Sequence, residues 1–213
     1  MILKVSPTRI TLLNLKKELK VAQKGYKLLK DKRDGLMKTF MQVIRDARTL
    51  RESIEERLGD AFETYAAASA LIHKKSLDVA FMEPGVELSL AVDTKHIMSV
   101  PVPTFEVKKE GNPYAYGMLG SNAQLDASIT KFDAVLEDII RLAALEKTAA
   151  QLAEEIERTR RRVSALENTR IPNLEDTIRF ITQQLEERAR DAVVSTMRVK
   201  AMIVAKEEQG ETV

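Results

Sequence analysis

The sequence predicts a mainly α-helical protein, a long antiparallel two-helix coiled coil with a small β-hairpin-containing cap at the turn. Two long stretches repeat apolar residues at steps of three and four, which is typical of helices that pair along a seam. Between them, a shorter stretch collects half of the Gly and most of the Pro. The chain is 44% hydrophobic but only 5% aromatic, which suits exposed, paired helices better than a compact core.

Residues 1–72 are expected to form the first long helix. Ser6 followed by Pro7 indicates its start, because proline lacks only an N–H that the first turn leaves unused. One extra four-residue step after Ile54 is a stutter, through which the helix is expected to continue. The predicted seam is Leu12, Leu15, Leu19, Ala22, Tyr26, Leu29, Arg33, Leu36, Phe40, Val43, Ala47, Leu50, Ile54, Leu58, Ala61, Tyr65, Ala68 and Ile72.

Residues 73–120 are expected to form a hairpin cap with connecting loops. Apolar residues alternate with others over 86–92 and again over 98–102, which predicts two strands joined by a turn at Asp93-Thr94-Lys95. Pro101 and Pro103 restrict the second strand to a sheet edge, because neither can donate to a ladder.

Residues 121–213 are expected to form the second long helix, starting at a capping box of Ser121 and Gln124. Pro172 predicts a kink rather than a break, since the periodicity continues past it without a Gly or Ser cluster. The helix should end near Lys206 and outlast the first, leaving a single-helix tip. Its predicted seam is Phe132, Val135, Ile139, Leu142, Leu145, Ala149, Leu152, Ile156, Thr159, Val163, Leu166, Arg170, Leu174, Ile178, Ile181, Leu185, Ala189 and Ala192.

Signatures of catalysis are missing from the sequence. It contains no Cys, no Gly-rich phosphate loop and no H-E-x-x-H pair, and His73 and His96 alone are too few for a typical metal site. We therefore predict no catalytic residues, no cofactor and no metal. No apolar run approaches the roughly 20 residues of a membrane-spanning helix, so the chain is expected to be soluble or peripheral.

Positive charge is concentrated near the start of the chain, where residues 1–51 carry 14 Lys or Arg against 4 Asp or Glu. Candidate partner contacts are the Lys17, Lys20, Lys24 and Lys27 stripe, which shares one helical face, and the Arg160, Arg161 and Arg162 run. An ordinary solvated helix face is the alternative interpretation. Nucleic acid is disfavoured, because only Tyr26 could stack on a base near these charges.

Several motifs along nearly the full chain resemble one family. They are Ser6-Pro7-Thr8-Arg9, the stretch 28–34, the stretch 121–126, the Thr159-Arg160-Arg161-Arg162-Val163 block and the following Ile171-Pro172. Together they are similar to the D subunits of the V/A-type rotary ATPases. Ser164 and Asn168 depart from the family pattern, which bears on local contacts only.

The resemblance implies a non-catalytic central rotor shaft that transmits torque between an ATP-binding head and an ion-translocating membrane ring. Its paired termini would enter the head of catalytic A and regulatory B subunits, and its hairpin end would face the membrane. The small F subunit of the stalk and the socket subunit above the proteolipid ring would be further partners, in a cytoplasmic complex peripheral to the membrane. The alternatives are a prefoldin-like chaperone or scaffold coiled coil and, more remotely, an enzyme.

Overall fold

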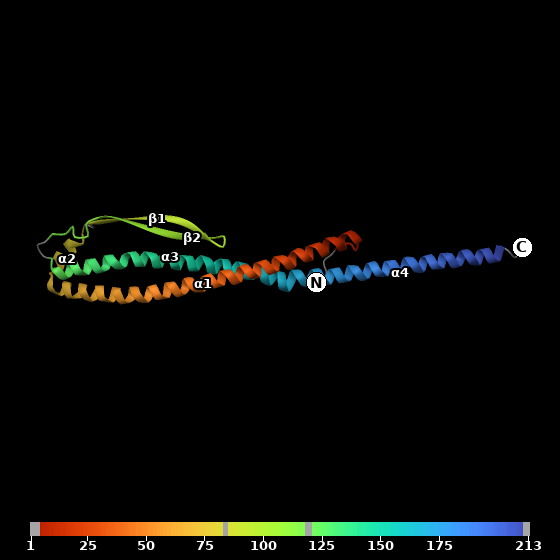
Figure 1. The fold of residues 1–213 in the computed structure, drawn as a ribbon, viewed down its shortest axis with the longest axis horizontal. Coiled ribbons are helices and arrows are strands. Elements are labelled where there is room, and N and C mark those ends of the chain that lie inside the picture. Colours follow the sequence, from red (N-terminus) through yellow and green to blue (C-terminus); the bar gives the residue numbers. More distant parts are fainter. Residues whose placement is uncertain (1–4, 83–84, 118–120, 211–213) are drawn as a thin grey trace. The chain divides into compact units, whose positions relative to one another are not determined.

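The computed structural model describes residues 5–82, 85–117 and 121–210, with side chains of the last helix described to residue 205. Four helices and two strands follow in the order α1 (Arg9–Leu71), α2 (Lys74–Ala80), β1 (Val86–Ile97), β2 (Val100–Gly111), α3 (Ala123–Ala165) and α4 (Ile171–Gly210), with a π-helical turn η1 (Leu166–Arg170) between the last two (Figure 1). The chain forms two compact units, one of Met1–Asp31 with Thr159–Val213 and one of Lys32–Arg158. The mainly helical fold with one hairpin is as predicted.

Helix α1 begins slightly later than predicted. Thr8, rather than Ser6, is the cap, since its Oγ1 accepts a hydrogen bond from the backbone N–H of Thr11 at 3.2 Å. Pro7 therefore precedes the helix instead of opening it. The predicted seam of α1 is confirmed, because all eighteen of its residues are buried or half-buried.

In the first unit, the start of α1 packs antiparallel against α4. Leu15 is buried in one cluster with Leu174 and Ile181. Polar contacts flank this seam, with Arg170 paired to Glu18 and the Arg188 Nη1 donating to the Pro7 carbonyl at 2.9 Å. The ascending residue numbers on one helix meet descending numbers on the other, as an antiparallel coiled coil requires.

In the second unit, α1 packs antiparallel against α3. Cations on α1 face carboxylates on α3, in the pairs Lys32–Glu155 and Arg57–Asp138. Pairs with this exposure contribute little stability each, so the buried seam supplies most of the attraction. Their consistent polarity instead favours one alignment of the two helices.

The hairpin turn lies further along the chain than predicted. Strands β1 and β2 pair antiparallel from Val86↔Gly111 to Ile97↔Val100, which places the turn at Met98-Ser99 and puts residues 93–95 inside β1. Both turn residues have positive φ, 50° and 70°, as a type I′ turn requires. That turn is normally marked by Asn-Gly or Asp-Gly, so Met98-Ser99 carries no sequence signal for it.

The hairpin folds back along the helices, with β2 lying between β1 and α3 (Figure 1). Near the tip, Val100 and Val102 are buried against Leu36, Leu152 and Ile156. At the base, the opposite face of the ribbon turns inward, where Val86 and Leu88 line a cavity. The strong twist of a two-stranded ribbon explains how both faces contact the helices at different points.

Gly35 of α1 lies directly beneath the hairpin tip. A Cβ at this position would stand 2.8 Å from the Met98 Cε. Glycine inside a helix costs about 0.5–1 kcal/mol relative to alanine, so this close approach gives a physical reason for its presence. The tip is therefore seated by a small residue on α1 as well as by the buried valines.

The cap of α3 is Asn122, not the predicted Ser121. Asn122 Oδ1 accepts from the backbone N–H of Leu125 at 2.8 Å, while its Nδ2 donates to the Ala68 carbonyl of α1 at 3.5 Å. One side chain thus starts α3 and ties it to the end of α1.

Replacement of Asn122 by Ala is expected to lower the free energy of unfolding by about 1 kcal/mol, the usual effect of losing an N-cap. Thermal and urea denaturation followed by circular dichroism measure it. Ser121→Ala is the matched control and should have the smaller effect; equal losses would mean that the cap is shared between the two residues.

The second long helix continues through Pro172 without a break, and its irregularity lies just before the proline. Residues Leu166–Arg170 form the π-helical turn, in which the Ile171 N–H donates to the Leu166 carbonyl. The predicted seam is wrong at Arg170, which is exposed and paired with Glu18. It is also wrong at three further exposed positions, which are Ile139, Ala189 and Ala192.

Candidate docking surfaces

The end of α4 has no seam partner among the described residues. Every residue from 186 to 205, here called the C-terminal segment, is exposed. Met197 is 65% and Met202 66% exposed, although both are large apolar side chains. The remaining exposed large apolar residues of the segment are Val193, Val194, Val199, Ile203 and Val204. Many exposed large apolar side chains on one unpartnered helix indicate a candidate site for binding another protein.

The basic residues singled out in the sequence are all exposed, and all belong to the first unit. At about 100° per residue, Lys17, Lys20, Lys24 and Lys27 centre about 140° around α1 from the Leu15 and Leu19 seam. The arginine run does not form a single face, because three consecutive residues point in three directions. Arg161 is directed away from the seam, and Arg160 and Arg162 flank it on opposite sides. The structure therefore places an outward basic stripe on α1 and a basic band around α3.

The region where the two long helices are connected carries a second apolar surface, in the second unit. Exposed large side chains here, called the connection-end patch, are Leu71, Val79, Phe81 and Met82, the last 82% exposed. Short helix α2, which was not predicted, supplies Val79 and is capped by His73 through its Nδ1. Phe81 of this patch also lines a cavity.

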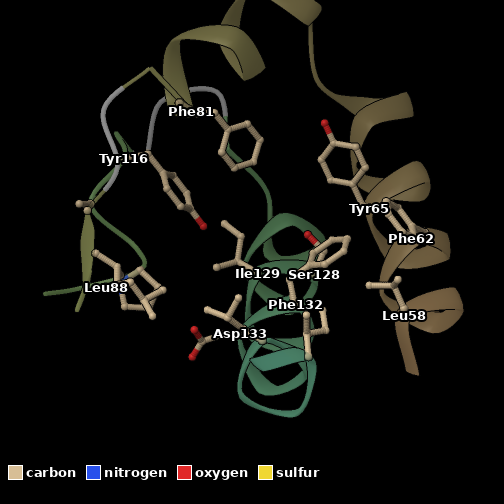
Figure 2. Close-up of a pocket in the computed structure, with 17 residues that line it drawn as sticks. Leu58, Phe62, Tyr65, Phe81, Leu88, Tyr116, Ser128, Ile129, Phe132 and Asp133 are labelled. Atoms are coloured by element: carbon tan, nitrogen blue, oxygen red, sulfur yellow. The ribbon is translucent and has the colours of Figure 1, made fainter. Parts of the chain in front are cut away.

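The cavity measures about 630 Å³ and is lined by rings from three helices and one loop (Figure 2). Phe62 and Tyr65 come from α1, Phe132 from α3 and Phe81 from the end of α2, as Figure 2 shows. Phe62 and Phe132 stack edge to face, with ring centroids 5.2 Å apart. Such a lining fits an apolar side chain or ligand.

Few polar groups border this cavity, and three of them make hydrogen bonds or ion pairs within the chain. Asp133 pairs with Lys109 of β2, and Ser128 Oγ donates to the Leu125 carbonyl at 2.8 Å. Tyr116 donates to the Asp126 carboxylate. Partial burial, and then this hydrogen bond, raise the pKa of Tyr116 well above its ordinary value. The site therefore offers shape and apolar surface rather than reactive groups.

Titration by phenolate absorbance is expected to show Tyr116 ionising above the pH of an ordinary tyrosine, because its pKa is raised. Its bond to Asp126 requires the neutral phenol, so the anchoring is fully present below about pH 10 and is lost as pH rises through the raised pKa of Tyr116. The difference between wild type and Tyr116→Phe isolates this step. If the two curves differ at the pH of an ordinary tyrosine, the anchoring is absent in solution.

The described part of the chain, residues 5–82, 85–117 and 121–210, contains no group of three or more His, Cys, Asp or Glu that could hold a metal ion. Among its helices, none is long and apolar enough to cross a membrane.

The paired helices and folded-back hairpin place the chain among antiparallel two-helix coiled-coil proteins. The family model that describes the D subunit of ATP synthase matches residues 11–201, so the chain belongs to the ATP synthase D-subunit family. The resemblance drawn from the sequence motifs is thereby confirmed.

Curated relatives agree over most of the chain. The V-type ATP synthase D subunit of Clostridioides difficile is 43% identical, covering 96% of this chain and 93% of the relative. Proteins of the same name from Fusobacterium nucleatum and Acetivibrio thermocellus are 41% and 42% identical, over 94% and 95% of this chain and 97% and 93% of the relatives. None of these three is a chaperone, so they lend no support to the prefoldin-like alternative.

The sequence predicts the single-helix tip but does not single out its apolar side chains as a docking surface, and it does not predict the connection-end patch. The C-terminal segment carries a sequence signal, since Val193, Val194 and the run Met202–Ala205 are apolar where the first helix offers no partner. The cavity has none, because its rings come from helices that are far apart in the sequence.

Proposed function

We propose that this chain is the central rotor shaft of a V/A-type ATPase, a non-catalytic component that transmits torque between the ATP-binding head and the ion-translocating ring. The observation that carries the proposal is the C-terminal segment, twenty consecutive exposed residues of one helix with seven large apolar side chains. A helix of this composition is marginal in water by itself and favours enclosure by other proteins of the complex.

The three docking surfaces suit different partners. The C-terminal segment is proposed to enter the head formed by the A and B subunits, where its apolar side chains would be enclosed. The connection-end patch and its cavity are proposed to meet the socket subunit above the ring. The F subunit would bind the side of the helix pair, in a complex peripheral to the membrane on its cytoplasmic side.

A shaft of this kind needs resistance to twisting. Two helices that share a buried seam resist it better than one, because torsion must separate packed side chains such as Leu15 and Leu174. The hairpin adds a third element in the second unit, where Val102 is buried between Leu36 and Leu152.

Reconstitution with the A, B and F subunits tests the proposal. A complex that forms and whose ATP hydrolysis depends on this chain supports it, whereas turnover by the isolated chain would contradict the non-catalytic role. If the chain holds unfolded proteins in solution and does not bind an ATPase head, the proposal that it is a rotor would be contradicted.

Within that assay, replacing Lys17, Lys20, Lys24 and Lys27 together by Glu is expected to weaken assembly or coupling and to change its salt dependence. The chain itself should stay folded, because exposed substitutions usually change stability by less than about 0.5 kcal/mol each. Replacing the same four residues by Arg keeps the charge and is the matched control. A Glu variant that assembles with the wild-type salt dependence would show that the stripe is only solvated.

A further inference from the structure

The π-helical turn Leu166–Arg170 marks a change of phase in the second long helix. Upstream, the seam positions Thr159 and Leu166 are seven residues apart, as a strict repeat requires. Downstream, the buried Leu174 and Ile181 are again seven apart. Leu166 and Leu174, however, are separated by eight. The helix therefore contains one residue more than the repeat allows.

A π turn is the local structure that accommodates one extra residue. The Ile171 N–H reaches back five residues to the Leu166 carbonyl instead of four, so the turn holds one residue more than an α turn. The burial pattern follows this shift. Arg170, where the strict repeat would continue, is exposed, and Ile171 is half-buried in its place.

The opposite helix has no matching irregularity. Near this contact the seam of α1 keeps its seven-residue spacing, with Leu12 to Leu19 and Leu15 to Ala22, and all four residues are buried or half-buried. A regular helix thus faces a helix with an inserted residue. Without the π turn, everything beyond it would be rotated by about 100°, and Leu174 would leave the seam.

The turn is also weaker in physical terms than the paired turns on either side of it. Glu167, Asn168 and Thr169 are exposed, and Pro172 removes one backbone donor from the ladder just beyond them. The side-chain contacts at the turn are polar, with Asn168 Nδ2 donating to Ser164 Oγ at 3.0 Å and Arg170 paired to Glu18. Segments with few buried contacts and an interrupted ladder open locally at lower free energy than their flanks.

We propose that Leu166–Arg170 is a torsional joint, in which the inserted residue keeps the seam in phase while giving the second long helix one site that yields under twist. The claim that this joint is twisted during function rests on the proposed rotor function. The claim that an inserted residue forces a π turn of low local stability concerns the isolated chain, and it can be tested separately.

Hydrogen exchange of the full-length chain by itself tests the structural part. Backbone amides of residues 167–171 are expected to exchange about ten-fold faster or more than those of the flanking turns. Pro172→Ala should preserve this fast patch, because the inserted residue remains. If Pro172→Ala instead slows the patch to the rate of its flanks, the proline alone creates the irregularity and the proposal is overturned.

Deletion of Thr169 combined with Pro172→Ala removes the inserted residue and restores the strict repeat. This variant is expected to melt at a higher temperature than wild type and to lose the fast-exchanging patch, while Thr169→Ala leaves both unchanged. A deletion variant that melts lower, or fails to fold, overturns the phase argument, since the two seams should then match better than before.

The functional claim is tested by the coupling of ATP hydrolysis to ion translocation in the reconstituted complex. The more stable deletion variant is expected to assemble but to couple less well than wild type, whereas Thr169→Ala should couple normally. If a stabilised, fully assembled deletion variant couples as well as wild type, the π turn has no role in coupling. The proposal that the chain is a rotor would not be affected by that result.

Discussion

Replacing Val193, Val194 and Met197 of the C-terminal segment by Ser is expected to leave the chain folded and to prevent its assembly with the ATPase head. These side chains are exposed in the isolated chain, so their loss removes no buried contact of the fold. Enclosure of each by a partner would contribute about 1.5–3 kcal/mol, so losing three would weaken binding about 1000-fold or more.

Circular dichroism of the variant and pull-down by the A and B subunits measure the two effects separately. The matched control changes polar residues of the same segment, Ser195→Ala with Lys200→Gln, and should assemble normally. If the triple variant assembles with wild-type affinity, the C-terminal segment is not the surface that the head holds.

Replacing Leu36 by Ala is expected to cost about 2–5 kcal/mol of the free energy of unfolding and to release the hairpin tip. Leu36 is fully buried, and it forms one cluster with Val100, Val102, Leu152 and Ile156. The cavity left by the smaller side chain would lie directly under the two valines, which hold β2 against the helices. Leu36 therefore joins the helix pairing to the hairpin.

Urea denaturation gives the loss of stability, and hydrogen exchange of residues 95–104 reports the release of the tip. Met37→Ala is the matched control, since the neighbouring side chain is of similar size but 42% exposed. Equal destabilisation by the two changes, or unchanged exchange in the hairpin, would contradict this account of how the tip is held.

The helix pair could be predicted because its signal is local and repeated. The buried residues of α1 follow one another at intervals of three or four residues, so the seam can be predicted without knowing its partner helix. The same reasoning failed at Arg170, because steps of three and four residues can absorb one inserted residue without an obvious break in the apolar pattern. It also failed at the hairpin turn, where Met98 and Ser99 adopt positive φ without the Gly or Asn that normally indicates it.

The docking surfaces also differ in whether the sequence could predict them. The Lys17 to Lys27 stripe follows from spacing alone, although whether a partner contacts it stays a prediction. The aromatic cavity does not follow from spacing, since Phe62, Phe81 and Phe132 meet only when three helices and a loop converge. Composition does not indicate such a site in a chain with few rings.

By itself, the sequence determined that two long helices share an apolar seam, that a hairpin separates them, and that the chain belongs to the D-subunit family. Only the tertiary structure decided where the ribbon lies, which of its faces is inward at each point, and how the inserted residue before Pro172 is absorbed. The reason is physical. A repeat reports which side of an element is buried, whereas the twist of the ribbon and the phase between two helices depend on what each element packs against.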